Sequence, residues 1–287
     1  MEQLPKPYIG ISGVGNKQQQ LDIARMFEQN GLGEVGRFAL LGVKATTKSQ
    51  LLSKESIGGA LWYPPAQEMP YVIDTEVAGH GVLQMYQSDR WKDLLQSMEL
   101  LEKSYERTRG WLHGIQFDLL PWMEQSEHCV KILGYARDLL MDLGRGALFL
   151  QCQDSIMQPN QNNRSKVMDQ LSSLYERGMV DYVLFDASCS TGKEMNPEAL
   201  KPWLHDARKA MPALGLAVAG GLDAETIQEH LPSLLNEVDE LSWDAEGRLH
   251  NPKPSKGGDG DLNMQNVADY LEASAKVLGV NSAQQRT

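Results

Sequence analysis

Short apolar runs alternate with helical patterns along most of this chain, and that alternation restricts its fold more than any other feature. The expected strands are 8–12, 38–45, 71–74, 114–118, 147–152, 181–187, 214–219 and 240–244. Segments with apolar residues at helical spacing, such as 91–101, separate them. Parallel strands need crossover helices. Eight strand–helix units therefore predict an α/β fold, an eight-stranded parallel (β/α)8 TIM barrel.

The length of the chain, 287 residues, suits one large barrel better than two ordinary domains. The sequence predicts a single (β/α)8 domain over 1–278 and a polar tail over 279–287. The weakest stretch is 46–70, where 58–63 could form an extra strand or the true second strand. A hydrophobic content of 41% is that of an ordinary globular protein.

Charge and cysteine usage exclude several classes of function. The formal net charge of −11 disfavours nucleic acid and anionic membrane as partners. No apolar stretch of about 18 residues could span a membrane, and the start of the chain lacks the pattern of a signal peptide. Cys129, Cys152 and Cys189 form no CxxC pair, so neither a disulfide framework nor a zinc site is indicated. We expect a cytoplasmic protein without cofactor or metal, and self-association into a homo-oligomer stays open.

The reactive residues of such a barrel lie where its strands end. The candidates there are Ser12, Lys44, Asp74, Asp118, Cys152, Asp154, Asp186, Gly220, Gly221 and Asp244. Clustered carboxylates can share a proton or hold a divalent cation, although aspartate after a strand also caps the next helix. Lys44 could form a Schiff base, bind a phosphate or pair with Asp74. No histidine is placed beside Cys152 or Cys189, and His80 is expected in the loop after the third strand.

Two segments carry a family resemblance. Residues 183–193 end a strand at Asp186 and continue into a loop rich in Ser, Thr and Gly, and 217–227 contain the turn Gly220-Gly221 and a helix start. They resemble the sixth and seventh strands of phosphoribosylanthranilate isomerases over about residues 180–230. The resemblance implies that Asp186 is the general acid of an Amadori rearrangement, in which an acid opens the ribose ring and a base removes the C2 proton.

The expected ligand is a phosphorylated small molecule. Glycine lets the backbone approach a ligand and expose N–H groups to it, so Thr191, Gly192, Gly220 and Gly221 are the predicted phosphate ligands. The first-strand cysteine that serves as the family's base is replaced by Ile9, so little phosphoribosylanthranilate isomerase activity is expected. Asp244 and Glu246 in the eighth loop would repel a phosphate unless they point away or bind a cation.

The sequence therefore favours a divergent relative that isomerises or cleaves a phosphorylated sugar derivative. Its predicted catalytic residues are Asp186, Asp118 and Lys44. Two alternatives stay open. One is a carboxylate-based or metal-assisted hydrolase or lyase that uses Asp118 and Asp186, and the other is a non-catalytic ligand-binding barrel.

Overall fold

The computed structural model describes ten segments of the chain. They are 6–45, 79–85, 102, 112–117, 127–142, 146–153, 157, 162–186, 194–252 and 261–280. Among these residues, no helix combines the length and the apolar character needed to cross a membrane.

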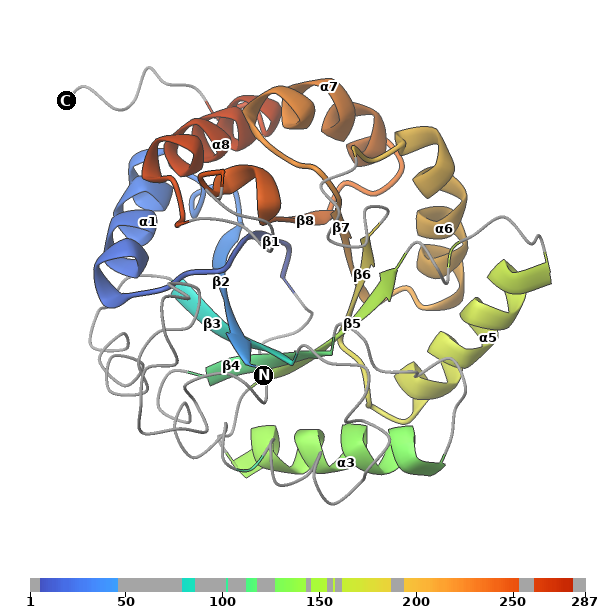
Figure 1. Ribbon diagram of the computed structural model, residues 1–287. Coiled ribbons are helices and arrows are strands. Elements are labelled where there is room, and N and C mark those ends of the chain that lie inside the picture. The colour runs from blue at the N-terminus through green and yellow to red at the C-terminus, as the bar shows by residue number, and fades with distance from the viewer. Residues whose placement is uncertain are drawn as a thin grey trace.

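The strands of the described segments form a closed barrel (Figure 1). They are β1 (Tyr8–Ser12), β2 (Phe38–Ala45), β3 (Gly79–Met85), β4 (Leu112–Phe117), β5 (Ala147–Gln153), β6 (Tyr182–Asp186), β7 (Gly215–Ala219) and β8 (Ser242–Ala245). Each pairs in parallel with the next, and β8 pairs with β1. The prediction of an α/β fold with parallel strands curled as a barrel is confirmed.

Helices surround the sheet. They are α1 (Lys17–Gln29), α3 (Glu127–Asp142), α5 (Asn162–Glu176), α6 (Pro197–Ala210), α7 (Ala224–Leu235), α8 (Met264–Val277) and a short 3-10 helix, η3 (Gly247–Leu249), between β8 and α8. Local sequence fixes several starts, because Asn16, Asn196, Asp223 and Asn263 accept backbone N–H groups of the first helical turn.

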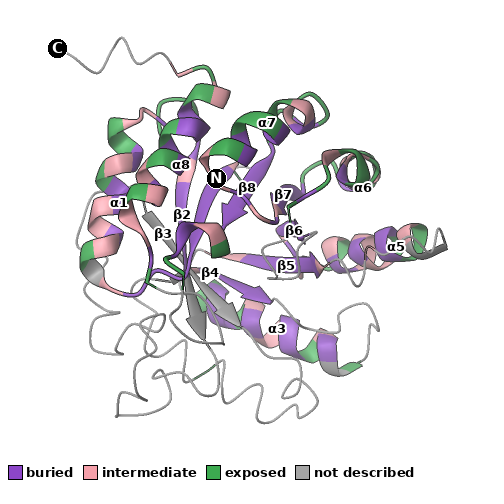
Figure 2. Ribbon diagram, turned by 45° about the horizontal axis from the view of Figure 1, so that its top comes forward, coloured by how far each residue is buried: buried purple, intermediate pink, exposed green. Residues whose placement is uncertain are grey.

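Successive strand side chains point alternately into the barrel and toward the helices, and this forms two apolar layers. One layer contains only strand residues, among them Tyr8, Leu40, Phe149 and Tyr182, and fills the inside of the barrel. The other joins the intervening strand residues to the helices. The described strands other than β3 are mainly buried, and the helices expose their outer faces (Figure 2). Residues that alternate with Tyr8, such as Gly10 and Ser12, therefore face the interior.

The third strand is a correction to the sequence prediction. The predicted strand 71–74 lies outside the described residues, and the strand that pairs with both β2 and β4 is Gly79–Met85. His80, expected in a loop, is a strand residue paired with Leu40. Segment 79–85 begins Gly-His-Gly, and glycine lowers strand propensity, whereas 71–74 is a more regular apolar run.

Candidate active site at the carboxyl end of the barrel

Three neighbouring strands place two aspartates at one level of the barrel. Asp186 on β6 pairs with Ala219 on β7, and Ala219 pairs with Asp244 on β8. Asp186 is two positions beyond Leu184 of the interior layer, so it faces the same side. Asp244 also lies inside, since its carboxylate is the neighbour that a side chain at Gly10 would meet. The small residue Ala219 lies between the two aspartates, at the end of its strand.

Asp186 is buried, with 3% of its surface exposed. The side-chain Nε2 of Gln151, on β5, donates a hydrogen bond of 2.7 Å to its Oδ2. Gln151 is in turn oriented by Gln153, whose Nε2 donates to its Oε1 at 3.3 Å. A buried carboxyl needs such donors. The amide fixes the orientation of Asp186 without supplying a counter-charge.

Asp244 is held by the first strand. Ser12 Oγ lies 3.1 Å from Oδ1 and 3.0 Å from Oδ2, so its one hydroxyl proton can be shared between the two carboxylate oxygens. Gly10 makes the room, because a Cβ there would lie 2.6 Å from Asp244 Oδ1. The carboxylate of Asp244 therefore points toward β1.

A buried tyrosine supports the same strand from outside. Tyr270 of α8 donates its hydroxyl to the carbonyl oxygen of Gly10 at 2.9 Å. Burial raises the pKa of Tyr270 well above its ordinary value, and the charge of Asp244 adds to the increase. Tyr270 therefore stays protonated and acts as a hydrogen-bond donor.

Gly220 and Gly221 form the turn that follows β7. Their φ angles of +124° and +59° lie in the region that favours glycine. Their carbonyl oxygens are engaged, since Met195 N–H donates to Gly220 O at 3.3 Å and Thr226 Oγ to Gly221 O at 3.1 Å. No acceptor for the N–H group of either glycine is found among the described residues. The turn thus offers backbone donors directly after Ala219.

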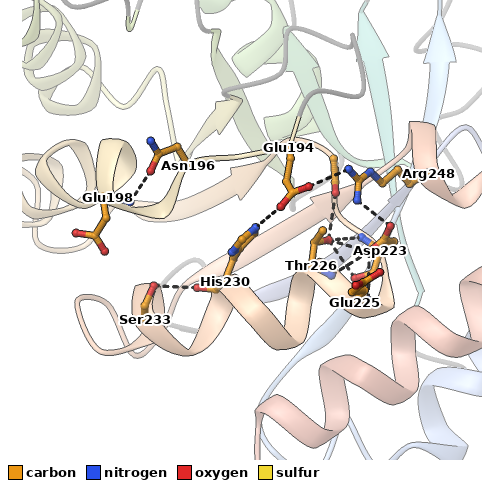
Figure 3. Close-up of polar contacts among 10 residues, drawn as sticks. Glu194, Asn196, Glu198, Asp223, Glu225, Thr226, His230, Ser233 and Arg248 are labelled. Carbon is orange, nitrogen blue, oxygen red and sulfur yellow. Dashed lines mark hydrogen bonds and ion pairs between the residues drawn. The ribbon is translucent and has the colours of Figure 1, made fainter.

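An ion-pair cluster lies beside this turn (Figure 3). Arg248 of η3 contacts Asp223 Oδ2 at 2.9 Å and Glu194 Oε2 at 3.3 Å, and Glu194 Oε1 contacts His230 Nε2 at 2.8 Å. Hydrogen bonds from His230 and Arg248 lower the pKa of Glu194. Burial opposes a similar change at Asp223, but the Thr226 N–H and Arg248 outweigh it, so that pKa is also lowered. The cluster joins the segment after β8 to α7.

The same region contains a group with metal-ligand chemistry. One ligand atom from each of Glu194, Glu229 and His230 lies within 4.8 Å of the others. Two of the three already contact each other, and Glu194 also pairs with Arg248. The contact between Glu194 and His230 and the ion pair between Glu194 and Arg248 therefore account for these side chains without a cation.

The structure brings together some of the predicted site residues. Asp186, Gly220 and Gly221 lie on or directly after neighbouring strands, as expected from the sequence. Asp118, Asp154, Thr191 and Gly192, together with Asp74 and Cys189, lie outside the described residues. Lys44 lies on β2, paired with Gln84 of β3.

The side chains of Cys152 and Ile9 both point away from the barrel interior. Cys152, a candidate nucleophile, is fully buried in the layer between barrel and helices, so its strand-end position does not place its side chain in the mouth. Ile9, at the position of the family's base, lies in that same layer. The interior residues of β1 near the mouth are Gly10 and Ser12.

Sequence reasoning missed the partners of both aspartates. Gln151 is not among the candidates from the sequence, and Ser12 is a strand-end candidate without an assigned role. The available signal was alternation, because Gln151 follows Phe149 by two residues and Ser12 follows Tyr8 by four. No sequence motif indicates that Arg248 belongs to this region.

Comparisons with known proteins show the fold. No protein-family model matches the chain, and no curated protein matches it significantly. The carboxyl transferase domain of Rhizobium etli pyruvate carboxylase, in a structure with pyruvate, matches with a TM-score of 0.54 and 12% identity over 98% of this chain and 47% of that chain. The same domain with pyruvate and biocytin gives a TM-score of 0.55 and 10% identity over 98% and 46%. This chain thus spans about half the length of these matched chains.

Proposed function

We propose that this protein is a barrel enzyme that acts on a phosphorylated sugar or sugar derivative by proton transfer, with Asp186 as its general acid. The observation that carries the proposal is the position of Asp186, a buried interior carboxyl at the end of β6, next to the glycine turn of β7. Working residues of such barrels lie at this end of the strands. A fold of this kind serves many chemistries, so the proposal rests on these residues and not on the carboxyl transferase domains.

The phosphate would bind at the turn Gly220-Gly221. Its two N–H groups are donors without an acceptor among the described residues, and barrels often bind phosphate between the loops after the seventh and eighth strands. Thr191 and Gly192 are proposed to complete this site from the preceding loop. Arg248 lies near the turn, but its charge is balanced by Asp223 and Glu194, so the proposed phosphate site depends on the backbone N–H groups of the turn.

Lys44 and Asp118 keep a place in the proposal as further catalytic candidates. Lys44 lies on a strand of the same barrel, and Asp118 directly follows the last residue of β4. The proposed reaction is an isomerisation or a cleavage rather than the phosphoribosylanthranilate isomerase reaction itself. Ile9 cannot accept a proton, so purified protein should turn over that substrate weakly or not at all.

The test is hydrogen exchange on defined sugar phosphates. Wild-type protein is incubated in D2O with ribose 5-phosphate, arabinose 5-phosphate or glucose 6-phosphate, and deuterium at C2 is followed by NMR together with product formation. We expect deuterium incorporation above the protein-free rate, since an acid–base site labilises that proton. Phosphate binding without exchange or product would favour a non-catalytic binding barrel and contradict the proposal.

A further inference from the structure

We propose that Asp244 is the base of this site, taking the proton that Ile9 cannot accept. This inference rests on the proposed function and assigns its second proton-transfer group. Asp244 is 6% exposed and its carboxylate lies inside the barrel, at the same level as Asp186. The two aspartates would then act on one ligand from β6 and β8, the two neighbours of β7.

The strand register gives the separation between the two groups. Ala219 is paired with Asp186 on one side and with Asp244 on the other. Neighbouring strands lie about 4.8 Å apart, so the two aspartate backbones are about 10 Å apart across β7. Ala219 contributes only a methyl group between them, and the glycine turn begins at the next residue. A sugar phosphate anchored at that turn would extend its carbon chain between the two carboxyl groups.

A hydrogen bond from the first strand orients Asp244. A base must be a carboxylate, and the single hydroxyl proton of Ser12 can be shared between its two oxygens, which lie 3.1 and 3.0 Å from Ser12 Oγ. The absence of a Cβ at Gly10 lets the carboxylate lie against β1, so residues 10 and 12 together prepare its position.

Other nearby groups fit the role of base less well. Tyr270 has a raised pKa and donates to Gly10 O, so it remains protonated. His250 is the strongest competitor, because its ring lies against Gly13 at the end of β1. Its Nδ1 is 2.7 Å from the Glu246 carbonyl oxygen, which can only accept, so Nδ1 carries a proton and Nε2 would be the basic atom. His250 comes after η3 and is therefore not a strand residue. Asp244, in contrast, lies on β8 at the level of Asp186.

The proton balance needs no further reagent. Asp244 takes the proton on the carbon next to the aldehyde, and the C–H electron pair forms a carbon–carbon double bond. The carbonyl electron pair moves onto oxygen, which receives the proton of Asp186. Asp244 then gives its proton to the former carbonyl carbon, while the Asp186 carboxylate takes the proton of the C2 hydroxyl, which becomes the ketone carbonyl. The product is the ketose, and both aspartates regain their starting protonation states.

The test compares Asp244→Asn with His250→Gln in the exchange experiment described above. For Asp244→Asn we expect a loss of deuterium exchange of about 10²- to 10⁴-fold, the usual contribution of a proton-transfer group. His250→Gln should keep exchange near the wild-type rate. Inorganic phosphate, titrated calorimetrically, should bind both variants as it binds wild type. Circular dichroism checks folding.

Ser12→Ala provides a second variant in case Asp244→Asn fails to fold. It keeps the carboxylate but removes the hydroxyl that orients it, so exchange should fall by less than in Asp244→Asn, with phosphate binding kept. Wild-type exchange rates in Asp244→Asn, or in Ser12→Ala if only that variant folds, would overturn the assignment. So would a loss in His250→Gln with Asp244→Asn unaffected. Absence of exchange in wild type would overturn the proposed function itself, and the assignment with it.

Discussion

The two ends of the barrel interior are built from the same strands but from opposite chemistry. At the amino end, the rings of Phe149 and Tyr182 stack at 4.5 Å, and Tyr8 packs edge-on against both. At the carboxyl end, the same strands present Ser12, Gln151 and Asp186. The comparison indicates that stability and reactivity are separated along the strand direction. Changes at one end should therefore affect folding, and changes at the other should affect ligands.

The largest expected effect is a loss of stability at the amino end. Phe149→Ala removes a ring that contacts both Tyr8 and Tyr182, so the free energy of unfolding should fall by about 3–5 kcal/mol. Phe149→Leu, which keeps most of the volume, should lose much less. Chemical denaturation measures both. A change below about 1 kcal/mol for Phe149→Ala would mean that the aromatic end does not carry stability.

A matched pair of substitutions, one at each end of β6, tests the separation directly. Asp186→Asn should reduce turnover of an active sugar phosphate by about 10²- to 10⁴-fold, with folding and phosphate binding kept. Asp181→Asn, just before the same strand, weakens contacts to Arg137 and Leu148 N–H and should lower stability with turnover retained. Equal effects of both variants on stability, with turnover unchanged in Asp186→Asn, would make Asp186 a structural residue.

A smaller effect is expected at the glycine turn. Gly221→Asp places a negative charge at the proposed phosphate site and should weaken binding of inorganic phosphate by at least about tenfold, on the order of 1.4 kcal/mol. Gly178→Asp is the control, since Gly178 has a similar φ of +65° with open space around it, in the turn before β6. Both substitutions place a side chain at a positive φ of similar size. Unchanged phosphate affinity in Gly221→Asp would show that the site is wrongly placed.

The smallest effect concerns acid stability at the carboxyl end. The lowered pKa values of Glu194 and Asp223 stabilise the fold fully above their unfolded values, about 4. That contribution is lost as the pH falls further, through the folded pKa values. Arg248→Met should therefore lower the melting temperature slightly at pH 7 and make it less sensitive to acid below about pH 4. Lys276→Met, in an exposed pair with Glu272, is the control. An identical pH dependence in Arg248→Met and wild type would contradict this role.

The parts of the site that the sequence predicted are those with a local signature. Asp186 ends an apolar run, and Gly220-Gly221 follows another, so strand-end positions could be assigned from pattern alone. The pairing of Gln151 with Asp186 and of Ser12 with Asp244 depends on register between strands distant in sequence. No local pattern encodes that register.

The fold shows the same division between local and non-local information. Alternating periods predicted most strands, while β3 was misplaced because Gly79 and Gly81 weaken its strand signal. The position of β3 is determined by its pairing with β2 and β4 and not by the strand propensity of its residues. The outward direction of Cys152 likewise follows from counting positions back to Phe149, not from its place at a strand end.

The interior glycines restrict which substitutions the barrel can accept. A Cβ at Gly10 would collide with Asp244, one at Gly114 with Phe149, and one at Gly215 with Tyr182. In each case a side chain on a neighbouring strand lies where the methyl group would be. At Gly10 and Gly215, enlarging one member is tolerable only after its partner has become smaller, so the two positions should change together during evolution. At Gly114 the carbonyl oxygen of Ala147, 2.8 Å from a Cβ, also occupies the space. Pairwise covariation among related sequences would then record which strands are neighbours, and Gly10 with Asp244 would appear as a linked pair.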